Sequence, residues 1–153
     1  MTRVFENKSD LLGAVGETLG SSEWVEVTRE MVHQFADATG DHQWIHVDPE
    51  RAASSPLGST IAHGLFSLSL GPQFSYQLIH FDGFAHSLNY GYDKVRFPAP
   101  VPVGSRVRMR ATVVSAEQLP GGIQVKMSQV VEREGSDKPV VVAESVARVV
   151  EKS

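Results

Sequence analysis

The chain contains no cysteine among its 153 residues. The absence of thiols excludes disulfide bonds, a thiolate-ligated zinc site, an iron–sulfur cluster and a cysteine nucleophile. Basic residues are also few, since 14 lysines and arginines stand against 18 aspartates and glutamates, for a formal net charge of −4. No basic stripe is available to neutralise a line of phosphates, so we expect no nucleic-acid partner.

Long apolar runs are lacking as well. No Asp, Glu, Lys or Arg occurs from Ala52 to Phe81, but this segment carries two histidines, two glutamines and two prolines. It is too polar to cross a membrane, and we expect no membrane partner. The first residues have no signal-peptide core, because Glu6, Lys8 and Asp10 interrupt it, so the expected location is cytoplasmic.

The first half of the chain carries helical patterns and the second half carries extended ones. Capping residues and apolar periodicity predict helices over 10–15 (from Ser9 to Gly16), 29–39 (from Thr28 to Gly40), 49–54 (capped by Asp48) and 63–79, kinked at Pro72. A short strand is expected near 24–27. Period-two alternation predicts strands over 106–113, 123–128 and 140–150, joined by turns at 120–122 and 135–139.

The predicted helix over 63–79 is apolar nearly all round, and such a helix in a globular protein is buried on all sides. Short turns between the later strands favour antiparallel hairpins. The economical arrangement is an α+β, hot-dog fold, in which a curved antiparallel β-sheet wraps around one long central helix. We expect one domain over residues 1–153, and a homodimer that pairs the exposed sheet edges.

Asp41 and His46 lie in the segment richest in candidate catalytic groups, between a predicted helix end at Gly40 and the next start at Pro49. Loops held at both ends by rigid elements are common places for catalytic residues. A carboxylate and an imidazole at this spacing can converge on one water molecule and exchange protons with it. The residues alone also allow a structural role, with Asp41 capping local amides and His46 hydrogen-bonded in the core.

His42 and His46 have the spacing of the zinc-protease motif HExxH. That motif needs a long helix and a glutamate as general base. Here Gly40 and Pro49 leave little room for the helix, and Gln43 stands in place of the glutamate. We therefore expect no metal site.

Two further segments carry candidate binding residues. His63 and Gly64 lie at the start of the long predicted helix, where free amides suit a developing negative oxygen and glycine permits close approach. Equally, Gly64 can serve tight packing, and His63 can bond a neighbouring loop. Arg96, before a proline-rich corner, can face the active loop or a phosphate-bearing ligand, or can form an ordinary surface ion pair.

Three ordered motifs carry a resemblance to a known family: Gly40-Asp41-x-Gln43-x-x-His46 with Asp48-Pro49, then Ile61-Ala62-His63-Gly64, then the segment 95–104. Over nearly the whole chain the sequence resembles the MaoC-like dehydratases, and more closely their single-domain (R)-specific enoyl-CoA hydratases of actinobacterial type. The resemblance implies a hot-dog fold, a homodimer and reversible syn hydration of a trans-2-enoyl-CoA to the (R)-3-hydroxyacyl-CoA. It implies no cofactor, and coenzyme A enters only as part of the substrate.

The same resemblance implies that Asp41 and His46 hold the attacking water and that the Gly64 amide binds the thioester oxygen. This chemistry needs a base for the water, a proton for Cα and a donor for the enolate-like oxygen. The chain departs from the family in two places: Gln43-Trp44 replaces the usual Asn-Pro, and Pro72 stands where some members have a serine. Substrate binding is predicted for Gln43, Trp44, His63 and Arg96.

Other functions stay open at this point. The nearest is a (3R)-hydroxyacyl dehydratase acting on an acyl carrier protein, which a basic rim of Lys94, Arg106, Arg108 and Arg110 would favour. An acyl-CoA thioesterase and a non-catalytic acyl-thioester-binding protein are the other two, because a fold does not fix an activity. Trp44, Leu65 and Phe66 either line an acyl tunnel or belong to the core.

Overall fold

A six-stranded antiparallel sheet forms most of the second half of the chain in the computed structural model, which describes residues 1–153. The sheet has the order β2-β6-β7-β8-β5, and β3 also pairs with β6. Its strands are β2 (Thr18–Ser21), β3 (Val25–Glu26), β5 (His86–Arg96), β6 (Arg106–Leu119), β7 (Gly122–Arg133) and β8 (Val141–Val150). Two short strands, β1 (Arg3–Val4) and β4 (Ile79–His80), pair in parallel beside it.

The predicted hairpins are confirmed. On β6, Val107, Met109 and Val113 are fully buried while Arg106 and Arg110 are exposed, as the alternation requires. The turn at 120–122 joins β6 to β7, which is antiparallel to it, and β7 pairs in turn with β8.

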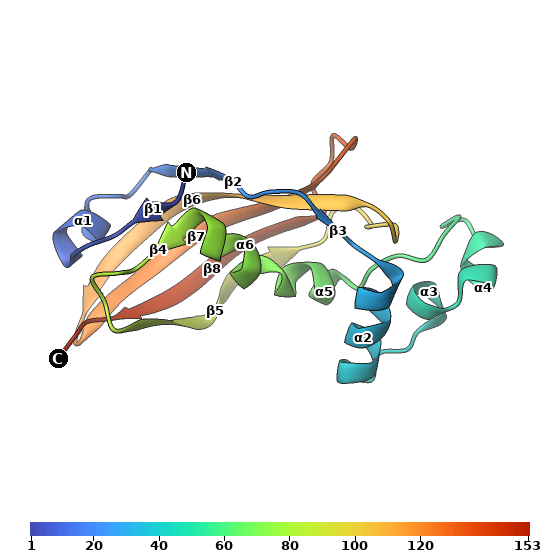
Figure 1. Cartoon of the computed structure of the whole chain (residues 1–153), viewed down its shortest axis with the longest axis horizontal. Coiled ribbons are helices and arrows are strands. Elements are labelled where there is room, and N and C mark those ends of the chain that lie inside the picture. The colour runs from blue at the N-terminus through green and yellow to red at the C-terminus, as the bar shows by residue number, and fades with distance from the viewer.

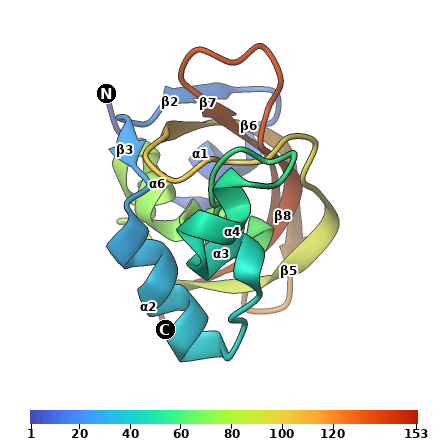
Figure 2. The same cartoon turned by 90° about the vertical axis from the view of Figure 1, so that its right-hand side faces the viewer.

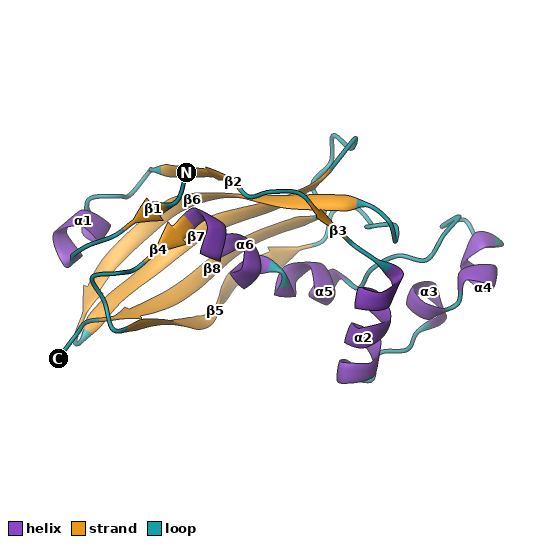
Figure 3. Cartoon of the chain, in the orientation of Figure 1, coloured by secondary structure: helices purple, strands orange, loops and turns teal.

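Two consecutive helices lie along the concave face of the sheet (Figures 1 and 3). They are α5 (Gly64–Ser69) and α6 (Gly71–Leu78). Phe66, Phe74 and Leu78 from these helices join the hydrophobic core formed by the inward side chains of the sheet. The predicted hot-dog arrangement, a curved antiparallel sheet around a central helix, is therefore confirmed.

The prediction of one continuous helix over 63–79 is wrong in detail. The helix breaks at Leu70, which ends α5 and precedes α6. Pro72 lies in the first turn of α6, where its missing N–H costs nothing, whereas inside one long helix it would leave the Leu68 carbonyl without a partner. Proline therefore divides the helix instead of kinking it.

The prediction that this helix is buried on all sides is also wrong for the single chain. The side chains of Leu65 and Tyr76 are 61% and 72% exposed. The sheet covers one side of the helices and leaves part of their outer face open. Large apolar groups exposed together on one side of a chain indicate a surface that another element can cover.

The helices before the central pair are α1 (Lys8–Leu12), α2 (Arg29–Thr39), α3 (Trp44–Val47) and α4 (Pro49–Ala53). The capping predictions for α2 and α4 are confirmed, because Thr28 accepts the Met31 N–H and Asp48 accepts the Arg51 N–H. The prediction for α1 is wrong by a few residues. Asn7 caps it in place of Ser9, by accepting the Asp10 N–H.

The segment α2–α4 projects beyond one end of the sheet, next to the start of α5 (Figures 1 and 2). Gly40 ends α2 in the left-handed conformation, with φ of 80°, and turns the chain back toward α5. The next element, α3, is a single helical turn where we expected only loop. His46 therefore lies on a helix, and Asp41 lies on the loop that precedes it.

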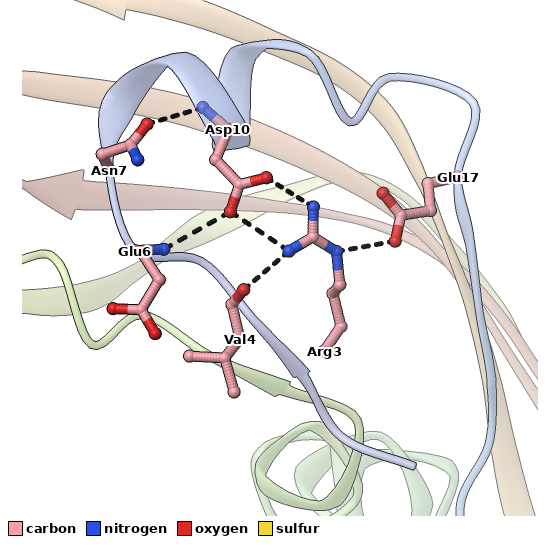
Figure 4. Close-up of polar contacts among 6 residues, drawn as sticks. All are labelled: Arg3, Val4, Glu6, Asn7, Asp10 and Glu17. Carbon is pink, nitrogen blue, oxygen red and sulfur yellow. Dashed lines mark hydrogen bonds and ion pairs between the residues drawn. The ribbon is translucent and has the colours of Figure 1, made fainter.

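At the other end of the molecule, Arg3 forms hydrogen bonds that hold the N-terminal segment in place (Figure 4). Its guanidinium donates to both carboxylate oxygens of Asp10, to Glu17 and to the Val4 carbonyl. The hydrogen bonds from Arg3 lower the pKa of Asp10. This cluster positions α1, and it lies far from the segment α2–α4. None of the helices combines the length and the apolar character needed to cross a membrane.

Candidate active site

His46 is held in one orientation by the chain that leads into α5. Its side chain is buried, and its Nδ1 lies 2.7 Å from the carbonyl oxygen of Ile61. A carbonyl can only accept, so Nδ1 carries the proton and Nε2 keeps a free lone pair. The Ile61 N–H also donates to the Ile45 carbonyl at 3.0 Å, which ties the same residue to α3 a second time. His46 is thereby fixed in the tautomer that a general base requires.

His63 links the two predicted catalytic residues. Its ring stacks on the His46 ring, with centroids 3.8 Å apart and planes inclined by 24°. Its Nε2–H donates to the backbone carbonyl of Asp41 at 3.0 Å. The ring of Phe35, on α2, also packs against the His63 ring, with 4.8 Å between the two centroids. His63 is 4% exposed, and its Nδ1 has no hydrogen-bond partner.

The sequence-predicted pair is brought together. A carboxylate oxygen of Asp41 and one ring nitrogen each of His46 and His63 all lie within 4.8 Å of one another. A water that bonds two such atoms at ordinary lengths and a near-tetrahedral angle separates them by about 4.5 Å. The Asp41 carboxylate is exposed and accepts only a long bond from the Gln43 N–H, at 3.4 Å. Asp41 and His46 can therefore share one water molecule.

The surroundings of His46 favour its neutral form. Burial lowers the pKa of His46, and the adjacent His63 lowers it further, against opposing contributions from the Ile61 carbonyl and Asp41. A neutral imidazole with a free Nε2 can take a proton from water at neutral pH. The site therefore combines the right tautomer with the right charge state for a base.

The ring geometry disfavours a metal ligated by both histidines. A ligand nitrogen directs its lone pair along the ring plane, and stacked rings direct their lone pairs side by side instead of toward one point. The HxxxH pair considered from the sequence is not assembled either. His42 is exposed and bonded to Asp37 at 2.9 Å, and this hydrogen bond raises the pKa of His42.

A cavity of about 310 Å³ opens beside His46. It is lined by Ile45, His46, Ile61, Ala62, Gly64, Ser67, Phe97, Ala99, Pro100, Val101 and Val140. Gly64 is its only glycine, and a Cβ there would approach the ring of Phe97 to 2.6 Å. The missing side chain at Gly64 therefore lets Phe97 lie against the start of α5. The Gly64 N–H, at the first position of α5, has no acceptor within the chain.

The remaining predicted binding residues lie outside this cavity. Gln43 is exposed at the start of α3, and its side chain makes no capping bond. Trp44 is half-buried, and the guanidinium of Arg51 lies over its ring, 4.3 Å from the ring centroid. Arg96 is exposed at the end of β5, next to the cavity residue Phe97, and has no carboxylate partner.

Sequence reasoning missed three groups that shape the site. The Ile61 carbonyl orients His46, Phe97 covers Gly64, and the Ser67 hydroxyl lines the cavity. Only Ser67 left a usable signal, since it follows Gly64 by nearly one helical turn and so lies on the same helix face. The two other contacts join segments that are distant in the chain, and no local pattern marks them. Leu65 and Phe66 do not line this cavity: Leu65 is exposed, and Phe66 packs on Phe35.

Comparison with known proteins identifies the family of this chain. The family model described as MaoC like domain matches residues 10–135. The 3-hydroxyacyl-thioester dehydratase Z of Mycobacterium tuberculosis is 56% identical over 149 residues, which cover 97% of this chain and 99% of that protein. Nodulation protein N of Rhizobium meliloti is 41% identical over 142 residues, covering 91% and 88%.

A solved structure shares the fold. The unliganded R-hydratase from Pseudomonas aeruginosa aligns over 90% of this chain and 83% of its own, with a TM-score of 0.73 and 25% identity. The chain belongs to the MaoC-like dehydratase family, as the resemblance predicted. It is a hydro-lyase with a hot-dog fold.

Proposed function

We propose that this protein is an (R)-specific enoyl-CoA hydratase, which reversibly adds water to a trans-2-enoyl-CoA to give the (R)-3-hydroxyacyl-CoA. The observation that carries the proposal is the Asp41–His46 pair, with side-chain atoms within 4.8 Å, beside a largely apolar cavity. Two similar proteins support the reaction class, since one is a 3-hydroxyacyl-thioester dehydratase and the other an R-hydratase.

The proposed reaction uses one water held by both residues. As the water oxygen bonds to Cβ of the enoyl group, the coupled pair of Asp41 and His46 accepts a proton from it. The pair then delivers a proton to Cα, on the same face of the double bond. Addition from a single face gives the syn product. The neutral state and free Nε2 of His46 support its part in this exchange.

The negative charge that develops on the thioester oxygen needs a donor. We assign this to the backbone N–H of Gly64, which lines the cavity with His46 and has no partner within the chain. Loss of one such donor typically costs about 100-fold in rate or more. The free amide alone serves as this donor, because α5 has six residues and too little length to carry a strong dipole.

Ion pairs within the sheet weaken the case for a carrier protein as the substrate. Three of the four cations that would form a basic rim are neutralised, since Arg106 pairs with Glu134, and both Arg108 and Arg110 pair with Glu132. Lys94 and Arg96 on β5 have no carboxylate partner, and the positive charge of Arg96, next to the cavity residue Phe97, suits the phosphates of coenzyme A. The dehydration of a 3-hydroxyacyl group on an acyl carrier protein is the alternative, since the name of the Mycobacterium relative fits either thioester.

We also propose a homodimer formed through β5. This edge strand pairs only with β8, and Leu88 and Tyr90 on it are 54% and 64% exposed. A second cavity, of about 170 Å³, lies between α6 and β5, with Pro72 and Tyr76 on one side and Leu88 on the other. A second copy of β5 would pair the free edge and cover these apolar groups.

The test is a spectrophotometric assay that follows loss of the enoyl-thioester absorbance of crotonyl-CoA, with Asp41→Asn as the control. The product is then offered to (R)-specific and (S)-specific 3-hydroxyacyl-CoA dehydrogenases. We expect loss of absorbance that depends on Asp41 and a product that only the (R)-specific enzyme oxidises. Release of free thiol without hydration would assign a thioesterase, and turnover confined to acyl-carrier-protein thioesters would assign the alternative.

A further inference from the structure

Ser67 carries a buried hydroxyl with nothing to bond. The residue is 1% exposed, and its Oγ has no hydrogen-bond partner. A buried unpaired hydroxyl costs about 1–3 kcal/mol relative to a paired one. The backbone N–H of Ser67 bonds to the His63 carbonyl at 3.2 Å, yet the hydroxyl does not use that neighbouring acceptor. A buried hydroxyl without a partner in its own chain indicates a hydrogen bond to a bound ligand.

The surroundings of Ser67 indicate where that partner sits. Ser67 lines the cavity of about 310 Å³ that His46 and Gly64 also line. Apart from His46, it is the only residue with a polar side chain in that lining, and the other walls are aliphatic, aromatic or backbone. A ligand that fills the cavity beside His46 therefore meets one side-chain hydroxyl. In apolar surroundings a hydrogen bond from this hydroxyl is stronger than it would be in water.

We infer that Ser67 donates a hydrogen bond to the thioester carbonyl oxygen and is the second donor, with the Gly64 N–H, on the oxygen where negative charge develops. This inference rests on the proposed function, which places the thioester in this cavity. Ser67 lies on α5 nearly one turn after Gly64, so both donors come from one rigid element. Two donors from a fixed scaffold are the common way to stabilise such an oxygen, and serine is among the side chains that serve.

Ser69 provides a matched control on the same helix. It is exposed, and its hydroxyl donates to the Phe66 carbonyl at 2.6 Å. Ser69→Ala therefore removes a hydroxyl that is already paired within the helix and does not face the cavity. Ser67→Ala removes the unpaired one, and the smaller side chain fits the same space. The two variants differ in the feature that the inference concerns.

The first experiment compares turnover and stability. In Ser67→Ala we expect kcat on crotonyl-CoA to fall about 100-fold with little change in KM, while the Tm stays at or above that of the wild type. Ser69→Ala is expected to keep wild-type turnover. A Ser67→Ala variant with wild-type kcat would overturn the inference. A fall in kcat that comes with a lower Tm would also overturn it, because it would assign Ser67 a structural role.

The second experiment does not depend on turnover. Crotonyl-CoA labelled with ¹³C at the carbonyl is bound to Asp41→Asn and to the double variant Asp41→Asn/Ser67→Ala, and the carbonyl stretch is recorded by difference infrared spectroscopy. A hydrogen bond weakens the C=O bond, so we expect a higher frequency in the double variant. Equal frequencies would overturn the role of Ser67. If wild-type hydration fails but the frequencies differ, the proposed function is wrong and the contact of Ser67 with the thioester stands.

Discussion

The stacked rings of His46 and His63, with centroids 3.8 Å apart, connect the base to the backbone of the loop that carries Asp41. The Nδ1–H of His46 donates to the carbonyl of Ile61, in the segment before α5, and the Nε2–H of His63 donates to the carbonyl of Asp41. Two separate hydrogen bonds to backbone carbonyls thus fix both tautomers. The spacing between Asp41 and His46 therefore depends on a third residue that need not touch the substrate.

His63 is therefore expected to act as a positioning residue. His63→Phe keeps an aromatic ring against His46 but loses the bond to Asp41, and should lower kcat by about tenfold. His63→Leu loses both contacts and should lower kcat further. Because His63 lowers the pKa of His46, both variants should also move the acid limb of the pH–rate profile upward. An unchanged pH profile in active variants would contradict this role.

Asp41 and His46 should each be essential. Asp41→Asn and His46→Gln are each expected to lower kcat by about 100-fold to 10,000-fold, because each removes half of the group that moves the proton. Asp41 is exposed, so Asp41→Asn should keep the wild-type Tm, which circular dichroism measures. His42→Gln is the matched control, since His42 is exposed and pairs only with Asp37. Wild-type turnover in either of the two catalytic variants would contradict the assignment.

The lowered pKa of His46 sets the direction of the pH response. The base must be unprotonated, so activity should persist below the ordinary histidine value of 6.5 and fall only at lower pH. The free energy of unfolding should change with pH in the same direction as the activity. Below pH 6.5 the unfolded chain binds a proton at His46 before the folded chain does, so the free energy of unfolding should decrease as the pH falls.

His46→Gln is the control for the stability effect. Urea unfolding at pH 7.5 and at pH 5.5 measures it for both proteins. The wild type should lose more of its free energy of unfolding between these values than His46→Gln does. Equal losses in the two proteins would show that other groups carry the pH dependence.

Local patterns were sufficient for much of the fold. Thr28 and Asp48 cap α2 and α4 through bonds to amides three residues away, and both helix starts could be predicted from neighbouring residues alone. Predicting the helix break at Leu70 would have required recognising that Pro72 fits the first turn of a new helix. The stack of His46 on His63 joins residues 17 apart in the sequence and arises only when α3 docks beside α5. No residue pattern contains that contact.

The ion pairs of the sheet are a second feature that the sequence alone did not predict. The register set at the β6–β7 turn, where Leu119 faces Gly122, would place Arg108 opposite Arg133 if it continued unchanged. A bulge between Val113 and Ser115 shifts the register by one residue and places Arg108 opposite Glu132. The pairing of Arg108 with Glu132 could not be predicted from the sequence for this reason, because one extra residue in β6 exchanges a cation for a carboxylate opposite Arg108.

The dimer is tested by placing a charge on the free edge of the sheet. In the proposed homodimer a second copy covers β5, so Leu88→Arg would bury an unpaired charge in apolar surroundings at the interface. Leu88 is 54% exposed in the single chain, and the monomer should tolerate the change. We expect light scattering to give a dimer mass for the wild type and a monomer mass for Leu88→Arg at micromolar concentration.

Val114 supplies the control for this experiment. It is an apolar residue of β6, 43% exposed and remote from β5 in the strand order. Val114→Arg adds the same charge to the surface of the same sheet and should leave the dimer intact. A monomeric wild type would contradict the proposal. Dissociation by both variants would show that added charge, and not the β5 edge, governs association, whereas dissociation by Leu88→Arg alone assigns the interface to the strand that leads into Arg96 and Phe97.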